Sequence, residues 1–310
     1  MYKQKFDHNH KNEPISVVIC AHNEEPNLRE LLPTLYKQNY PEFELIVVDD
    51  RSTDGTQNYL REEEINHPKL TRLRIDKCPD HINEKKYALT LGIKAAKNEW
   101  ILFTDADCIP SSKMWIYEMS RAFNEQTEIV LGYSPYEKQK GFLNYFIRFE
   151  TLYTAIQYLS LALAGSPYMG VGRNMAYRKS LFLNNNGFNR QIGITGGDDD
   201  LFINAHAHKK NTKVVIGKNN LVRSIPKTTI KSYFRQKKRH LSVGKHYKSS
   251  DKFILGLLSV SHLIYWASLI CLAVLNEEPY WIGGGFLIRI VVQFSVFEMA
   301  KKKLGEGPHL

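Results

Sequence analysis

Two aspartates, Asp105 and Asp107, directly follow the apolar run Trp100–Phe103. Residues i and i+2 of an extended segment point to the same side, so both carboxylates can face one ligand. The carboxyl ends of strands are where open α/β sheets bind their ligands. Paired carboxylates there suit Mg²⁺ or Mn²⁺ held together with substrate phosphates. The alternative is a solvated acidic loop in which Asp107 or Ser111 caps the next helix.

Acidic residues also follow other expected strands and loops. They are Glu24, the run 49–54 and the run 198–200. Each alone is explained by the preference of Asp and Asn for turns and helix N-caps. The carboxyl ends of parallel strands meet in one crevice, however. The sequence therefore predicts that the acids at the three strand ends converge on one site, as a nucleotide-dependent transferase requires.

Strands and helices alternate in the first half of the chain, which predicts an α/β fold with a mostly parallel sheet flanked by helices. The expected strands are 16–20, 45–48, 70–75 and 100–104, and the expected helices are 27–37, 55–64 and 84–97. The strands are apolar almost throughout, which is typical of burial on both faces. No G-x-G-x-x-G motif follows the first strand, which argues against a dinucleotide-binding domain.

The pattern after the fourth strand is less regular. A strand is expected within 128–136. An aromatic-rich helix is expected at 142–163, either on a membrane surface or packed inside the protein. A glycine-punctuated loop or strand covers 170–176, and the acidic run 198–200 opens a helix at Leu201.

The apolar segment 253–275 contains no Asp, Glu, Lys or Arg. As a helix it would be roughly 34 Å long, enough to cross the ~30 Å hydrocarbon core of a bilayer. A second apolar segment, 280–297, carries Arg289, and a charge at that depth is costly unless it is paired. The sequence predicts a C-terminal transmembrane helical hairpin, with an interfacial helix as the alternative for the second segment.

The formal net charge is +10, with a dense basic cluster at 227–248 directly before the first apolar segment. This position favours anionic membrane lipids over nucleic acid as the partner. Basic flanks at 227–252 and 301–303 predict that the polar part of the protein lies on the cytosolic side of the inner membrane. Four cysteines without a C-x-x-C pair fit a reducing compartment, and the polar segment 1–13 shows no signal peptide.

Several short motifs, in this order and spacing, resemble those of membrane-associated family 2 glycosyltransferases of the GT-A type. They are S-V-V-I-C-A-H-N-E at 16–24, V-V-D-D-R-S-T-D-G-T at 47–56, K-K-Y-A-L at 85–89 and T-D-A-D at 104–107. The similarity extends from about Ile15 to His240. It implies a nucleotide-sugar donor, a divalent metal ion and inversion at the anomeric carbon.

The resemblance also implies roles for individual residues in binding the nucleotide. Asp50 would accept a hydrogen bond from the base. Ala21 and Glu24 would line the pocket for the base and the ribose.

Three further residues are implied in binding the metal and the diphosphate. Asp107 would be the principal ligand of Mn²⁺ or Mg²⁺, and Asp105 would contact the ribose or the metal. Lys85 would lie near the diphosphate or the sugar. The ion would act as a Lewis acid that stabilises the leaving nucleoside diphosphate.

An inverting transfer needs a general base for the acceptor hydroxyl. The family places it in a Glu-Asp pair followed by x-Asp/Glu-Leu, which the resemblance matches to the segment ending at Asp200-Leu201, with Gly197 in place of Glu. We expect Asp198 to be the base, and Asp199 is the alternative. The three aspartates are also favourably placed at the N-terminus of a helix.

A last motif, Gln236-Lys237-Lys238-Arg239-His240, resembles the Q-x-x-R-W motif of the polymerising members, with His240 in place of Trp. Gln236 and Arg239 would then help to hold the diphosphate and the acceptor. A plain basic helix at a membrane surface is an equally good interpretation.

The sequence thus predicts a glycosyltransferase that moves a sugar to a lipid-linked or membrane-proximal glycan. We expect the sugar donor to be UDP-linked. The expected parts are a polar tail 1–13, a GT-A domain 14–226, a basic juxtamembrane helix 227–252, a transmembrane hairpin 253–300 and a basic cytosolic tail 301–310. The alternatives are a metal-dependent nucleotidyltransferase and a non-catalytic membrane-anchored scaffold that binds a nucleotide. The acidic loop after the first strand is unsuited to a triphosphate, which argues against the former.

Overall fold

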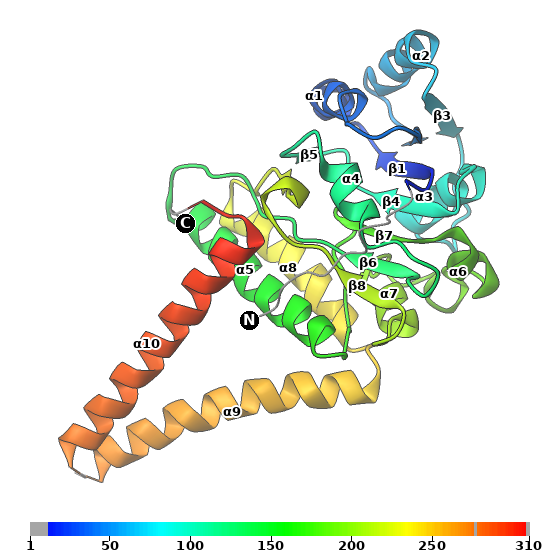
Figure 1. Ribbon diagram of the computed structural model, residues 1–310. Coiled ribbons are helices and arrows are strands. Elements are labelled where there is room, and N and C mark those ends of the chain that lie inside the picture. Colours follow the sequence, from blue (N-terminus) through cyan, green and yellow to red (C-terminus); the bar gives the residue numbers. More distant parts are fainter. Residues whose placement is uncertain (1–11, 276–277, 308–310) are drawn as a thin grey trace.

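The computed structural model describes residues 12–275 and 278–307, and within them a seven-stranded sheet forms the centre of the protein (Figure 1). Its order is β3-β2-β1-β4-β7-β6-β8. The strands are β1 (Ile15–Ala21), β2 (Phe43–Asp50), β3 (Leu70–Ile75), β4 (Trp100–Phe103), β6 (Ile129–Leu131), β7 (Met175–Arg178) and β8 (Thr212–Val214). Strands β1 to β4 are parallel, which confirms the fold class expected from the sequence.

The second half of the sheet departs from the simple alternation. Strand β7 is antiparallel to both β4 and β6, so the sheet is mixed. Strand β6 covers only three residues of the expected segment 128–136. Pro135 follows soon after and has no N–H for a ladder bond. In the segment expected as a loop or strand at 170–176, only the last two residues belong to β7.

Alternate residues of the parallel strands face the two sides of the sheet, as the period of a strand requires. Val17 and Ile19 pack with α1 (Glu25–Tyr36) and α4 (Trp115–Ser120). Val18 belongs to a second core with α3 (Glu84–Ala95) and α5 (Phe142–Leu163). Both faces of β1 and β2 are therefore covered, which explains their continuous apolar sequences.

The remaining elements surround the carboxyl ends of these strands or lie beside them. They are α2 (Thr56–Asn66), α6 (Lys179–Asn184), α7 (Asp200–His206), α8 (Ile230–Gly244) and a two-stranded sheet of β5 (Cys108–Pro110) and β9 (Val222–Ser224). Helix α5 buries one face in the core, whereas Phe142, Tyr145 and Tyr153 on its other side are exposed. It is thus a packing helix, and Phe149 and Tyr153 of its partly exposed side stack on Phe297.

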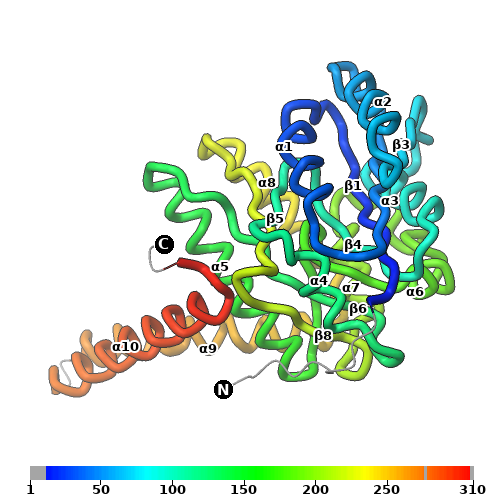
Figure 2. Tube along the Cα trace, turned by 45° about the horizontal axis from the view of Figure 1, so that its top comes forward, coloured from blue at the N-terminus to red at the C-terminus, as the bar shows by residue number. Residues whose placement is uncertain are grey.

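Helices α9 (Ser249–Val274) and α10 (Pro279–Leu304) extend away from the rest of the protein as a hairpin (Figures 1 and 2). Both are long and apolar enough to cross a membrane. Arg289 Nη2 donates a hydrogen bond to His262 Nδ1 (2.6 Å), so the charge in the second helix has a partner on the first. Pairing of this kind lowers the cost of a charge inside a bilayer.

The second hairpin helix is longer than the sequence indicates, and the boundary expected at residue 300 falls inside α10. Beyond α10 the chain returns to the sheet. Glu306 makes a buried ion pair with Arg148 of α5 (3.6 Å) and accepts a hydrogen bond from Tyr133 after β6. The part of the expected tail that the structure describes is therefore attached to the central domain.

Candidate active site

The loops after β1 and β2 are joined by one asparagine. Asn23 adopts a left-handed backbone (φ 56°), and its Oδ1 accepts hydrogen bonds from the backbone N–H groups of Thr53 (2.8 Å) and Asp54 (3.3 Å). Asn tolerates this conformation better than most residues. The two strand ends thus form one unit beside the site.

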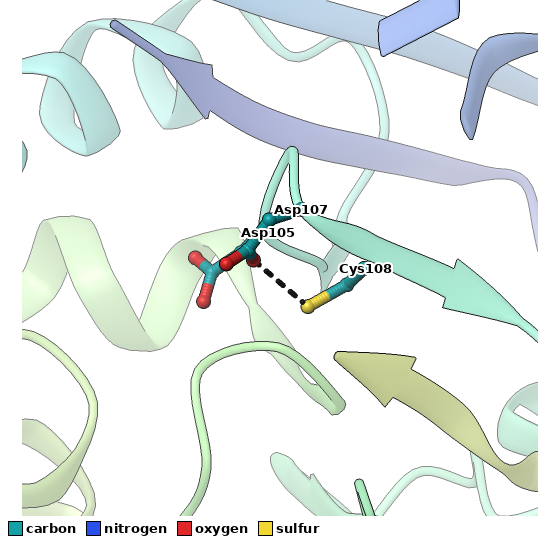
Figure 3. Close-up of side chains that lie close together, drawn as sticks. All are labelled: Asp105, Asp107 and Cys108. Carbon is teal, nitrogen blue, oxygen red and sulfur yellow. Dashed lines mark hydrogen bonds between the residues drawn. The ribbon is translucent and has the colours of Figure 1, made fainter. Parts of the chain in front are cut away.

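Asp105 and Asp107 lie on the turn between β4 and β5, with their carboxylates close to the thiol of Cys108 (Figure 3). One ligand atom from each of the three lies within 4.8 Å of the others. Cys108 Sγ donates a hydrogen bond to Asp107 Oδ1 (3.3 Å). Burial raises the pKa of this thiol far above its usual value, which favours its protonated form.

The two carboxylates differ in their electrostatic surroundings. Desolvation and the charge of Asp105 together raise the pKa of Asp107. Desolvation also acts on Asp105, but Lys85 outweighs it and keeps the pKa of Asp105 below its usual value. Two hard oxygen donors with an excess of negative charge fit Mg²⁺ or Mn²⁺ better than a thiophilic metal.

Lys85, in the first turn of α3, lies between two acidic loops. Its Nζ is 3.0 Å from Asp105 Oδ1 and 3.2 Å from Asp198 Oδ2. The Asp198 side chain is 9% exposed, so this pair lies largely out of water. The structure thereby brings together three residues that the sequence assigned to separate motifs.

The neighbouring Lys86 positions the loop before Asp198. Its Nζ donates hydrogen bonds to the carbonyl oxygens of Gln191 (2.6 Å) and Ile194 (2.8 Å), and the side chain is buried. The N–H of Asn83, the N-cap of α3, donates to the carbonyl of Ile192 (2.9 Å). The first turn of α3 therefore fixes this loop by three hydrogen bonds.

Asp199 has a different environment from Asp198. Its Oδ1 accepts from the N–H of Asp200 and its Oδ2 from the N–H of Gly172, both at 2.8 Å. A Cβ on Gly172 would lie 3.1 Å from Asp199 Oδ2, so glycine permits this close approach. Gly197 has φ +73°, a conformation that strains a side-chain-bearing residue. The backbone conformation at position 197 therefore favours glycine.

A groove of about 780 Å³ begins at these acids and continues along α8 and α5. The expected residues that line it are Lys85, Asp105, Asp107, Asp198, Asp199, Gln236, Arg239 and His240. Its size is in the range of small-molecule sites.

Helix α8 forms one wall of the groove. Gln236 Nε2 donates a hydrogen bond to the Tyr136 hydroxyl (3.2 Å). Desolvation and the neighbouring cations, Arg239 first among them, lower the pKa of His240 to about 4. His240 is therefore neutral at pH 7, in a strongly positive part of the groove.

The residues expected to bind the base lie outside the lining of this groove. Ala21 ends β1, Asp50 ends β2 and Glu24 precedes α1. Both carboxylate oxygens of Asp50 accept from Arg51, at 2.7 and 3.2 Å. Arg51 also pairs with Glu84 (2.8 Å). A base that hydrogen-bonds to Asp50 must therefore share it with Arg51 or displace that side chain.

No sequence motif predicted a role for Arg173, which lies in the loop before β7 and lines the groove. Its guanidinium donates hydrogen bonds to Ser134 Oγ (2.8 Å) and to the Tyr136 hydroxyl (3.2 Å), and it lies over the Tyr136 ring. A single Arg among glycines carries no motif. Only the packing of the loop after β6 against that before β7 reveals it.

Residues 16–184 match the model of the family described as Glycosyl transferase family 2. The chain belongs to this family. Among curated relatives of glycosyl transferase family 2, poly-beta-1,6-N-acetyl-D-glucosamine synthase from Staphylococcus epidermidis is 32% identical over 98 residues, 31% of this chain and 22% of that protein. The probable glycosyltransferase YdaM from Bacillus subtilis is 32% identical over 154 residues, 48% of this chain and 36% of that protein. The matched parts are thus a fifth to about a third of these relatives.

Solved structures of glycosyltransferases share the fold. A mannosyltransferase from Pyrobaculum calidifontis, in complex with GDP-Man and Mn²⁺, aligns with a TM-score of 0.62 and 19% identity over 96% of this chain and 86% of its own. TarS from S. aureus aligns with a TM-score of 0.50 and 21% identity over 68% of this chain and 60% of its own. At these identities the likeness shows the GT-A fold of this family 2 member.

Proposed function

We propose that the protein transfers a sugar from a nucleoside diphosphate donor to a hydroxyl of a membrane-proximal acceptor, with inversion at the anomeric carbon. The single observation that carries this proposal is the ammonium group of Lys85 between Asp105 and Asp198. It joins the acids assigned to the donor with the acid assigned to the acceptor. Both reactants of a single displacement would therefore lie at one end of the groove.

Asp107 and Asp105 would hold a divalent cation, Mn²⁺ or Mg²⁺, together with the donor diphosphate. Such an ion stabilises the charge that develops on the departing diphosphate. Lys85 keeps Asp105 ionised and orients it toward the donor. Ala21, Glu24 and Asp50 would bind the base and ribose at the adjoining strand ends.

Asp198 would act as the general base. The acceptor oxygen attacks the anomeric carbon, the bond from that carbon to the diphosphate oxygen breaks, and the hydroxyl proton passes to Asp198. Asp199 is the weaker candidate because each of its oxygens already accepts a backbone N–H. We assign it the role of holding the loop against Gly172.

The hairpin supports a membrane-proximal acceptor. Anchoring an enzyme beside its acceptor raises the effective concentration of that acceptor. The basic flanks favour a cytosolic position of the catalytic domain. Gln236, Arg239 and His240 would then contact the acceptor or the diphosphate from α8, which leads into the hairpin.

A donor screen tests the proposal. The detergent-purified chain is incubated with Mn²⁺ or Mg²⁺ and a panel of UDP-, GDP- and dTDP-sugars, and released nucleotide is measured. We expect one donor to be turned over, and the Asp107→Ala and Asp198→Ala variants to be inactive. Absence of turnover together with absence of metal-dependent nucleotide binding would refute the proposal and favour a non-catalytic scaffold.

A further inference from the structure

The segment directly before Asp198 has a backbone that needs support from its neighbours. Gly196 and Gly197 have φ of +80° and +73°. Glycine reaches such conformations at little cost, but it also reaches many others, because it lacks a Cβ. Two consecutive glycines therefore fix the direction of the chain less firmly than other residues would. The position of the Asp198 carboxylate depends on what packs against this segment.

The end of α8 packs against these two glycines. Val243 is buried, and its Cγ1 lies 3.1 Å from the place that a Cβ on Gly197 would occupy. Its Cγ2 lies 3.4 Å from the corresponding place at Gly196. Contacts this close leave the loop little room to move toward α8. Helix α8 thus supports the loop in addition to Lys86 of α3.

The chain after α8 binds the other end of the acidic run. The Tyr247 hydroxyl donates a hydrogen bond to the carboxyl group of Asp200. Burial and the charge of Asp199 raise the pKa of Asp200, and this hydrogen bond opposes the rise. The Tyr247 ring packs edge-to-face against the buried Tyr168, with ring centroids 5.9 Å apart. The ring is therefore held in place while its hydroxyl reaches Asp200.

Helix α7 binds the same part of the chain through a second side chain. Asn204 is four residues after Asp200, so both lie on the same side of α7. Its Oδ1 accepts a hydrogen bond from the N–H of Lys248 (2.9 Å), and its Nδ2 donates one to Asp251 Oδ2 (2.7 Å). The segment 247–251, which leads from α8 into α9, is therefore bound to α7 at two successive turns.

We propose that Tyr247 is a positioning residue for the proposed base. By holding Asp200 at the start of α7, it fixes the direction in which the nearby Asp198 carboxylate faces the acceptor hydroxyl. The inference rests on the proposed function, because it concerns the base of that reaction. Asp198 and Asp200 both line the groove, and one residue separates them. Because α9 begins at Ser249, the same contact connects the base to the start of the hairpin.

Steady-state kinetics on the full chain test the inference. Release of nucleotide is followed with the donor identified in the screen, and water serves as the nucleophile. We expect Tyr247→Phe to lower kcat about tenfold, the effect of losing one hydrogen bond to a charged group. The KM for the donor should stay unchanged, because the change leaves Asp105 and Asp107 in place.

The matched control removes an equivalent hydrogen bond elsewhere. The hydroxyl of Tyr36, on α1, donates to Glu63 Oε2 (2.8 Å), and α1 is far from α7 (Figure 1). Tyr36→Phe should therefore keep the kcat of the unaltered chain.

A double-mutant cycle separates positioning through Asp200 from a general loss of stability. Asp200→Ala removes the acceptor of the hydrogen bond, so adding Tyr247→Phe to it should cause no further loss of kcat. Asp200→Asn keeps an oxygen acceptor, so Tyr247→Phe should still lower kcat in that background. Melting temperatures of the same samples show whether each variant is folded.

Two results would overturn the inference. One is an unchanged kcat in Tyr247→Phe. The other is an equal loss of kcat on adding Tyr247→Phe to Asp200→Ala and to the unaltered chain, which would show that Tyr247 acts through other contacts. Binding of nucleotide with Mn²⁺ is recorded in parallel. If the unaltered chain turns over a donor and either result is found, only this inference fails. If the unaltered chain neither binds nucleotide nor turns over a donor, the proposed function itself fails.

Discussion

Lys85 Nζ lies 3.2 Å from Asp198 Oδ2, and this ion pair connects the first turn of α3 to the loop that opens α7. The same ammonium group contacts Asp105 at 3.0 Å. Without a cation between them, two carboxylates in a partly desolvated cleft would repel each other. The position of the proposed base therefore depends on a residue that need not itself react.

Replacing this cation should impair the reaction more than the fold. We expect Lys85→Met to lower kcat/KM by about 100-fold, because the base and the donor acids lose their common partner and their alignment. Steady-state kinetics on the donor identified in the screen measures this. Lys94→Met, on the exposed face of the same helix, should leave the rate unchanged. Wild-type kinetics for Lys85→Met would refute the role given to the ion pair.

The two candidate bases can be separated by their asparagine variants. Asp198→Asn should lower kcat by about 10²–10⁴-fold, the contribution typical of general base catalysis, with little change in nucleotide affinity. Asp199→Asn should instead lower the melting temperature, since an amide cannot accept through both of its polar atoms. Loss of kcat at full stability in Asp199→Asn would transfer the role of base to Asp199.

Metal binding should depend on carboxylates and not on the adjacent thiol. We expect Asp107→Asn to lose the stabilisation that nucleotide confers in the presence of Mn²⁺, because the principal oxygen donor is neutralised. Cys108→Ser should retain it. Calorimetric titration with Mn²⁺ and nucleotide measures both variants. Retained Mn²⁺ affinity in Asp107→Asn would place the metal elsewhere.

Lys86 should matter for stability although it lies outside the groove. Lys86→Met leaves the carbonyl oxygens of Gln191 and Ile194 without their donor, and unsatisfied buried polar groups cost about 1–3 kcal/mol each. Urea denaturation should therefore show a lower free energy of unfolding. Lys86→Arg keeps the donor and should recover part of the loss. An unchanged midpoint in Lys86→Met would contradict this interpretation of the loop.

The return of the chain after α10 can be tested by a double-mutant cycle. Removing one partner of a buried ion pair costs about 3–5 kcal/mol, because the other charge is left uncompensated. We expect Arg148→Met and Glu306→Gln each to lower stability markedly, and the double variant to lose less than their sum. Additive losses in thermal unfolding would show that the two side chains do not interact in solution.

The sequence reveals the parallel half of the sheet because β1, β2 and β4 contain apolar runs that acidic residues end or soon follow. Strands β1 to β4 and helix α3 lie close to the expected positions for this reason. Strands β6 and β7 are too short for a periodic signal, and their pairing is decided by contacts between distant segments. The antiparallel insertion between β4 and β6 could therefore not be predicted locally.

The candidate site likewise contains residues that a sequence motif reveals and residues that only contacts between distant segments reveal. Asp105 and Asp107 are recognisable because they share one short turn, whereas the approach of Lys85 to Asp198 joins α3 to a loop far along the chain. Arg173 belongs to no motif, and its place in the groove follows from the packing of its loop against Ser134 and Tyr136. The pairing of Asp50 with Arg51 also depends on the left-handed backbone of Arg51 (φ 56°).

The hairpin contacts the catalytic domain at both of its ends. At its start, Asn204 of α7 donates a hydrogen bond to Asp251 (2.7 Å). At its end, Glu306 pairs with Arg148, and Phe297 of α10 stacks on Phe149 and Tyr153 of α5. A domain attached at one point can rotate about that point. A domain attached at both ends of a helical hairpin keeps a fixed orientation relative to the hairpin. The mouth of the groove then stays at a fixed height along the hairpin axis. Such a geometry would favour proposed acceptors whose reactive hydroxyl lies at a matching distance from their membrane anchor.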